Sequence, residues 1–141
     1  RFPYPLQAHE SLPVLFVSPD GDATGGRSWR TAYHSLQDAV DAAQAGTQIW
    51  IAGGTYPGSV TIRDHQALYI YGGFSGSEKK LGDRNLHAHP VIIDGGGDVS
   101  TVLRIKDSEY IRIDGIEVTG GRALGEREKG CGAAGSQGVY R

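Results

Sequence analysis

Short runs of β-branched and aromatic residues alternate with glycine-rich breaks along most of this 141-residue chain. Such runs favour strands, and glycine or Asp-Gly pairs favour the tight turns between them. Runs that begin at residues 49, 68, 91 and 111 recur about every 20 residues. A strand–turn–strand unit at this spacing predicts a parallel β-solenoid in which each repeat forms one coil.

One segment, residues 35–46, has a helical period instead. Ser35 is a natural N-cap, and Gly46 is placed to end the helix in the left-handed conformation. Four apolar residues between them are spaced to form one stripe: Leu36, Ala39, Val40 and Ala43. A helix this short needs tertiary packing, so the stripe is expected to cover the open apolar end of the first coil.

An antiparallel sandwich or barrel is the alternative, because it also contains many short strands and turns. Hairpin turns of the Asn-Gly type are few, however. Asp114-Gly115 is one candidate, but a corner at this pair would let the flanking apolar residues face one interior. Those residues are Ile111, Ile113, Ile116 and Val118. The solenoid is therefore favoured.

The chain divides into three segments by composition. Residues 1–13 contain three prolines and no period, which predicts an extended N-terminal arm. Residues 14–121 hold the capped coils. Residues 122–141 are a charged stretch followed by a glycine-rich loop or tail, and no capping element is evident there.

The overall composition excludes some classes of function. Fourteen basic residues are balanced by 16 acidic ones, for a net charge of −2, so a nucleic-acid partner is not expected. No apolar run reaches the roughly 20 residues that span a bilayer. Glycine is abundant, at 22 residues, and Cys131 is the single cysteine, which rules out an internal disulfide framework.

Several motifs in order resemble the N-terminal region of bacterial pectate-lyase-like right-handed parallel β-helix proteins, which are secreted or displayed on the cell surface. The motifs are FVSPDG at 16–21, SWRTA at 28–32, SLQDA at 35–39, GTQIWIAGGTY at 46–56, LYIYGGFSGSE at 68–78 and IDGIEVTGG at 113–121. The resemblance implies an all-β, right-handed parallel β-helix with a short N-terminal capping α-helix. It also implies an extracellular or cell-surface location and a structural, adhesive or polysaccharide-active role. Chains of this family usually continue for many more coils.

The resemblance also implies how an enzyme of this family would work. Such enzymes cleave acidic polysaccharides, and they use several of their own carboxylates to hold Ca²⁺ and a basic residue to remove a proton. The acids available in the coils are Asp94, Asp98, Asp107, Asp114 and Glu117. Asp94 and Asp114 each precede a glycine, which favours a role in turns. We therefore expect no catalytic residue and no cofactor in this chain.

Two weaker metal candidates lie outside the coil strands. Asp20 and Asp22 flank a glycine and could contribute oxygens to Ca²⁺, but the glutamate that completes a calcium loop is missing, so a solvated turn is favoured. His87 and His89 are two residues apart without an evident third ligand, which favours surface histidines.

Basic residues of the last coils offer one further hypothesis. Arg104, Lys106 and Arg112 could form a sugar-binding groove with aromatic neighbours. Those neighbours are Tyr69, Tyr71 and Tyr110. On a solenoid, outward residues of these types more often form the solvated face.

The function predicted from the sequence is that of a non-enzymatic extracellular structural protein. An open edge near Ile116 and Val118 would accept the apolar side chains of the arm of another copy, and repeated head-to-tail contacts would give a filament. The arm residues concerned are Phe2, Tyr4 and Leu6. The partner is then the chain itself, with extracellular polysaccharide as another candidate. The alternatives are the first coils of a larger polysaccharide lyase or glycoside hydrolase, and a glycan-binding adhesin.

Overall fold

The structure is a computed structural model that describes residues 12–121 and 138–140. These residues form mainly β-strands with one α-helix and one short 3₁₀ helix. In chain order the elements are β1 (Val14–Val17), α2 (Leu36–Ala42), β2 (Gln48–Ala52), β3 (Gly54–Pro57), β4 (Val60–Arg63), β5 (Gln66–Phe74), η1 (Leu81–Asp83), β6 (Val91–Val99), β7 (Leu103–Lys106), β8 (Glu109–Asp114), β9 (Ile116–Gly121) and β10 (Gly138–Tyr140).

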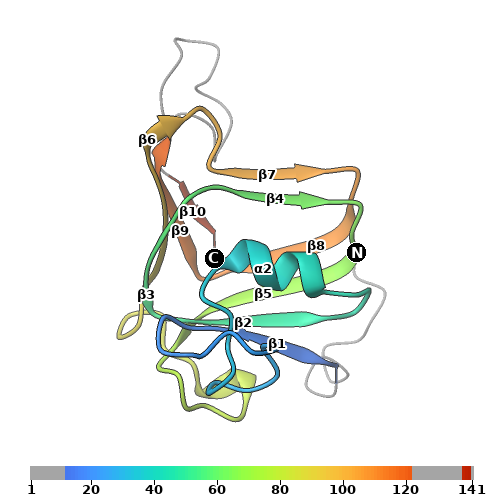
Figure 1. Ribbon diagram of the computed structural model, residues 1–141, viewed down its shortest axis with the longest axis vertical. Coiled ribbons are helices and arrows are strands. Elements are labelled where there is room, and N and C mark those ends of the chain that lie inside the picture. The colour runs from blue at the N-terminus through green and yellow to red at the C-terminus, as the bar shows by residue number, and fades with distance from the viewer. Residues whose placement is uncertain (1–11, 122–137, 141) are drawn as a thin grey trace.

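The strands lie in three sheets, ordered β1-β2-β5-β8, β10-β9-β6-β3 and β4-β7. We call them sheets A, B and C. All strand pairs are parallel except β9 with β10. From β2 onward the chain visits A, B and C in turn, repeats the circuit with β5, β6 and β7, and then enters β8 and β9 (Figure 1). Parallel sheets visited in this cyclic order are compatible with a β-helix.

Apolar residues stack in ladders on the inner side of the sheets. In sheet A, Leu15 pairs with Ile49, Ile49 with Ile70, and Ile70 with Ile113. In sheet B, Ile93 lies between Tyr56 and Val118. These residues belong to one hydrophobic cluster, so the predicted inward stacks are confirmed.

The predicted repeat of about 20 residues assigned one run to the wrong series. The run at 91–93 is part of β6 in sheet B, whereas the runs at 49, 68 and 111 lie in sheet A. The runs at 60 and 102 lie in adjacent strands, β4 and β7, although 42 residues separate their starts. The segment 75–90 between β5 and β6 lengthens this circuit, so residue counts do not measure coils here.

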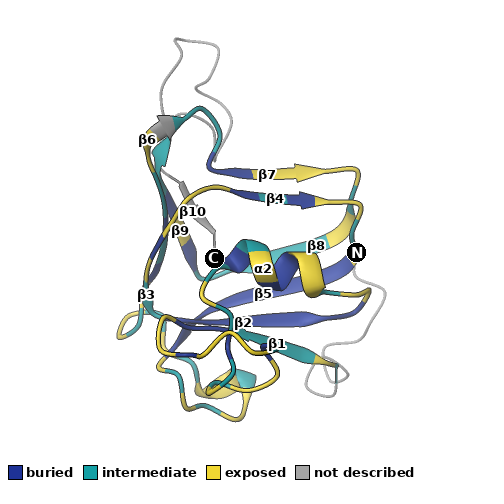
Figure 2. Cartoon of the chain, in the orientation of Figure 1, coloured by how far each residue is buried: buried dark blue, intermediate teal, exposed yellow. Residues whose placement is uncertain are grey.

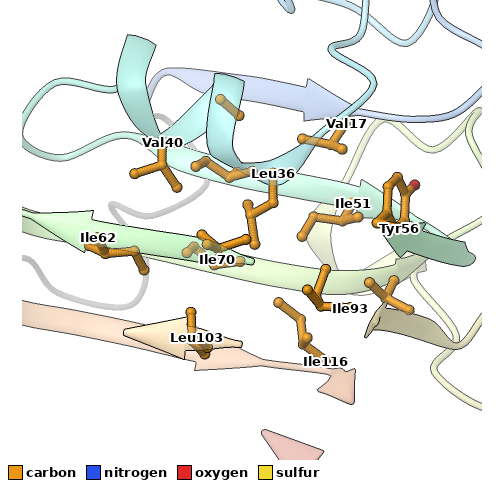
Figure 3. Packing of buried hydrophobic residues seen from close by; sticks show 14 of the residues in the cluster. Val17, Leu36, Val40, Ile51, Tyr56, Ile62, Ile70, Ile93, Leu103 and Ile116 are labelled. Carbon is orange, nitrogen blue, oxygen red and sulfur yellow. The ribbon is translucent and has the colours of Figure 1, made fainter. Parts of the chain in front are cut away.

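The helix α2 covers the interior as predicted, although it is shorter than predicted. Ser35 caps it, because the Ser35 hydroxyl oxygen accepts a hydrogen bond from the Asp38 N–H at 3.2 Å. The helix ends at Ala42, before Gly46, so Gly46 is not its cap. Leu36 and Val40 are buried and point into the interior toward Ile51 and Ile62 (Figure 3). The other side of α2 is exposed to solvent (Figure 2).

A corner, not a hairpin, separates β8 from β9. Gly115 has φ of 86° and joins strands of different sheets. A Cβ atom on Gly72, at the matching corner of the previous coil, would lie 2.3 Å from the Gly115 carbonyl oxygen. Glycine is required where the two corners approach this closely.

The outer side of sheet A carries a second apolar cluster. Trp50 and Phe74 stack with ring centroids 4.7 Å apart, and Trp29 packs at 5.5 Å from Phe74. Tyr69 and Tyr71 are buried in the same cluster. The prediction that they lie on a solvated face is therefore wrong: their large apolar surfaces are covered, in part by Trp29 and Leu81 from two connecting segments.

Candidate functional site

A set of contacts that joins two coils surrounds Arg84, in the segment between β5 and β6. Its guanidinium lies 3.2 Å from an Asp114 carboxylate oxygen and donates to the Gly72 carbonyl oxygen at 3.1 Å. It also lies over the Tyr71 ring, with Cζ 5.1 Å from the centroid. One side chain thus holds this segment against corners of two successive coils. The sequence alone does not single out Arg84, because only the fold brings it to Asp114.

Asp114 sits between two cations. Besides Arg84, the Arg112 guanidinium is 4.0 Å from the second Asp114 carboxylate oxygen. Burial raises the pKa of the neighbouring Tyr71 phenol, and the two guanidinium groups only partly oppose this effect. Tyr71 therefore stays a neutral phenol beside the ion pair.

A pocket of about 340 Å³ opens next to this ion pair. Its lining residues come from the segment before β6 and from the start of β6 and β9: Leu86, His87, Pro90, Val91, Gly115, Ile116 and Glu117. Val91 and Ile116 are buried and form an apolar floor, whereas His87 and Glu117 are exposed. The pocket can hold a small ligand that has an apolar face and polar groups at its edge.

The candidate acids whose side chains the structure describes do not converge. Asp94 accepts a hydrogen bond from the Gly96 N–H at 2.9 Å, so its predicted turn role is confirmed. Asp114 is engaged by Arg84 rather than by its own turn. Asp107 is an exposed corner residue with φ of 52°, and Glu117 borders the pocket. The side chain of Asp98 lies outside what the structure describes.

The loop proposed as a calcium candidate is held by local hydrogen bonds. Thr24 donates to an Asp22 carboxylate oxygen from both its hydroxyl and its backbone N–H. The bond from the Thr24 hydroxyl is the main reason that the pKa of Asp22 lies below its ordinary value. Asp20 is exposed, and its N–H donates to the Ser18 hydroxyl. The solvated turn stays the favoured interpretation of Asp20 and Asp22, and calcium binding there stays the weaker candidate.

Within residues 12–121 and 138–140, no three His, Cys, Asp or Glu side chains gather as a metal site would require. His87 and His89 lie in the segment before β6, where His87 borders the pocket. Cys131 lies outside the described residues.

The predicted sugar groove is not assembled. Arg104 and Lys106 are exposed on β7 in sheet C, whereas Arg112 lies on β8 in sheet A beside Asp114. Tyr69 and Tyr71 are buried, and Tyr110 is 43% exposed. The two cations of β7 therefore lie on another sheet than Tyr69 and Tyr71, whereas Arg112 is paired with Tyr69 on the outer face of sheet A.

The residues predicted for self-association are placed only in part. Phe2, Tyr4 and Leu6 lie outside the described residues. Ile116 and Val118 are buried, and β9 pairs with β10 on the side away from β6. The expectation of an open edge at β9 is thus wrong, because β10 supplies the missing hydrogen-bonding partner.

Open edges are found instead on β7 and β8. In the part of the chain that the structure describes, each of these strands has a neighbour on one side only. Ile105 of β7 is 45% exposed, although its partner Ile62 on β4 is fully buried. Ile111 and Ile113 of β8 are half-buried, while the matching Leu68 and Ile70 are fully buried.

The described helices include none that is long and apolar enough to cross a membrane.

Comparison with known proteins gives one informative similarity. No protein-family model matches the chain, and no solved structure matches it either. The chain is 29% identical over 114 residues to pectate lyase PEL9 of Emericella nidulans, an alignment that takes in 76% of this chain and 28% of that protein.

This relative supports a pectate-lyase-like relationship, and the chain spans little more than a quarter of its length. It also overturns one prediction. A non-enzymatic structural protein was expected, because the acids in the coils do not suggest a catalytic site. The similar protein is an enzyme, so that expectation is corrected: the similarity points to a polysaccharide lyase-like domain.

Proposed function

We propose that residues 14–121 are the capped first coils of an exported polysaccharide lyase with a right-handed parallel β-helix. The lytic site lies on further coils that stack on β7 and β8. The similarity to a pectate lyase of which the aligned region makes up 28% supports the reaction class. Parallel crossovers within a sheet are right-handed in about 98% of cases, which supports the handedness.

The contrast between the two ends of the coils carries this proposal. At one end α2 lies over the interior, and Leu36 and Val40 are buried against the first coil. At the other end Ile105 faces the same side of sheet C as the fully buried Ile62, yet is 45% exposed. An exposed core position beside an unpaired strand edge is what a further parallel strand would cover.

The contacts of the acids support a site beyond these coils. A lyase that holds Ca²⁺ needs several carboxylates that converge, since the ion takes six to eight oxygen ligands. Asp94 and Asp114 already accept hydrogen bonds from Gly96 and from Arg84. These residues serve the corners of the coils, which leaves the lytic chemistry to residues outside them.

The test compares two forms of the protein on polygalacturonate. A longer gene product that contains these 141 residues should release unsaturated oligouronides, and the 141-residue chain should release none. A control with calcium removed by a chelator separates calcium-dependent lysis from alkaline degradation. Absence of lysis by the longer product on polygalacturonate and on other uronic-acid polymers would contradict the proposal, as would a native protein whose intact mass equals that of the 141-residue chain.

A further inference from the structure

Three cations lie together on the outer face of sheet C. In β4 and β7 the paired residues Val60 and Leu103 face the core, so the next residues along each strand face outward. The outward residues of the two strands are Thr61, Arg63, Arg104 and Lys106. The three charged ones are exposed, and much of β7 is open to solvent (Figure 2).

The register sets the spacing of these charges. Arg63 is directly paired with Lys106, and Arg104 with Thr61. Adjacent strands are about 4.8 Å apart and alternate residues of one strand about 6.6 Å apart, so the three side chains start from neighbouring points on one flat surface. Only the fold shows this, because Arg63 lies 43 positions before Lys106 in the sequence.

Among the residues that the structure describes, no carboxylate lies within 4.0 Å of these three cations. Among the described residues, the ion pairs within 4.0 Å are those of Asp114 with Arg84 and Arg112, and they lie on another face. Asp64 and Asp107 directly follow the two strands, but at φ of 58° and 52° the chain turns away from the strand direction at each. The cations are therefore available to an anionic ligand.

We propose that Arg63, Arg104 and Lys106 form an accessory binding surface for an acidic polysaccharide, a polymer of uronic acids. This inference rests on the proposed function, because it assigns to the coils a role in holding the substrate polymer. A polymer with one carboxylate per sugar matches single charges spread over a flat face. A nucleic acid is a poorer match, because the chain as a whole carries a net charge of −2.

The test measures binding of the 141-residue chain to polygalacturonate. A triple variant, Arg63→Gln, Arg104→Gln and Lys106→Gln, should bind about tenfold more weakly at low salt, which is what three solvent-screened ion pairs supply together. The difference should shrink as salt is added. Because all three side chains are exposed, the variant should keep the wild-type unfolding midpoint.

A matched control removes the same charge elsewhere. Arg30→Gln, Lys79→Gln and Lys80→Gln alter three exposed cations in connecting segments, and this variant should bind polygalacturonate like the wild type. Fully methyl-esterified polygalacturonate has no free carboxylates, so neither the wild type nor the sheet C variant should bind it measurably. Equal weakening by the two triple variants would overturn the inference, since only net charge would then matter.

Different results would contradict the binding surface and the proposed lyase function. Unchanged polymer binding by the sheet C variant overturns the inference, even if the longer gene product cleaves polygalacturonate. Weakened binding by that variant supports the inference, even if the longer product has no lyase activity.

Discussion

The side-chain amide of Gln37 on α2 makes both hydrogen bonds that a neighbouring strand would offer to Thr61 on β4. Its carbonyl oxygen accepts from the Thr61 N–H at 2.7 Å, and its amide nitrogen donates to the Thr61 carbonyl oxygen at 3.0 Å. The helix therefore covers the apolar interior with one side and closes the free edge of sheet C with Gln37. A closed edge cannot pair with a strand of another molecule.

Gln37→Ala should lower the free energy of unfolding by about 1–2 kcal/mol, because two partly buried backbone groups lose their partners. Alanine is the better helix former, so a loss cannot come from helix propensity. Gln37→Glu should restore only part of the loss, since a carboxylate can accept from the Thr61 N–H but cannot donate to the Thr61 carbonyl. Denaturant unfolding measures both variants. Gln44→Ala, at an exposed position after the helix, is the control and should change little. A Gln37→Ala variant as stable as this control would show that the edge needs no closure.

The stripe on α2 gives a second prediction. Val40 is buried in the main cluster and Ala42 is exposed two residues later. Val40→Gln should destabilise the fold by about 2–4 kcal/mol, because it places an amide without partners in an apolar site. Ala42→Gln should stay within about 0.5 kcal/mol of the wild type. Thermal and denaturant melts compare the two; equal effects would mean that α2 does not seal the coils.

The contacts of Arg84 predict a local effect. Its side chain and that of Asp114 are 19% and 17% exposed, so the pair is only partly screened by water. Arg84→Leu should lower the free energy of unfolding by about 1–3 kcal/mol and should speed proteolysis within residues 75–90. Arg84→Lys should restore little, because a single ammonium group lacks the planar fork that reaches both Asp114 and Gly72. If Arg84→Lys were as stable as the wild type, only the charge of Arg84 would matter and its two-sided contacts would not.

Glu78 predicts a pH dependence of stability. Desolvation alone would raise its pKa, but backbone N–H groups, first that of Ser75 and then those of Glu78 itself and Ser77, hold the pKa of its carboxylate below the ordinary value of 4.5. A depressed folded-state pKa contributes stability that is complete above 4.5 and is lost as the pH falls through the folded value. The Trp29 indole donates to the Glu78 carbonyl. Protonation of Glu78, which weakens the hydrogen bonds within residues 75–78, should therefore also loosen the outer aromatic cluster.

The wild type should therefore lose more stability than Glu78→Gln when the pH is lowered from about 6 to about 3. Trp fluorescence during urea unfolding reports the difference, because Trp29 and Trp50 lie in that cluster. Parallel pH profiles for the two proteins would show that the carboxylate is not held by the backbone.

Local patterns predicted the elements better than their arrangement. Ser35 as the cap, the buried stripe of α2 and the inward isoleucines follow from neighbouring residues, and each is confirmed. The coil register could not be read from spacing, because the long segment 75–90 lies within one circuit. Asp64 and Asp107 also occupy matching corners at positive φ, a conformation that glycine usually supplies.

The candidate site was less predictable for the same reason. Contacts such as Arg84 with Asp114, or Arg63 beside Lys106, join residues that are adjacent only once the register of the coils is known. Tyr69 and Tyr71 were assigned to solvent because they alternate with inward residues, but a solenoid face can be covered by its own connecting segments. The β10 strand was missed because it lies within a glycine-rich stretch.

The most direct test of the central claim, that further coils stack on β7 and β8, compares Ile105→Ala with Ile62→Ala in two contexts. In the 141-residue chain, Ile62→Ala should cost about 2–5 kcal/mol of unfolding free energy and Ile105→Ala less than about 1 kcal/mol, because Ile62 is fully buried and Ile105 is 45% exposed. In the longer gene product, a new coil would bury Ile105, and both variants should then cost about 2–5 kcal/mol. An Ile105→Ala effect that stays below about 1 kcal/mol in the longer product would contradict the stacking of further coils on this end.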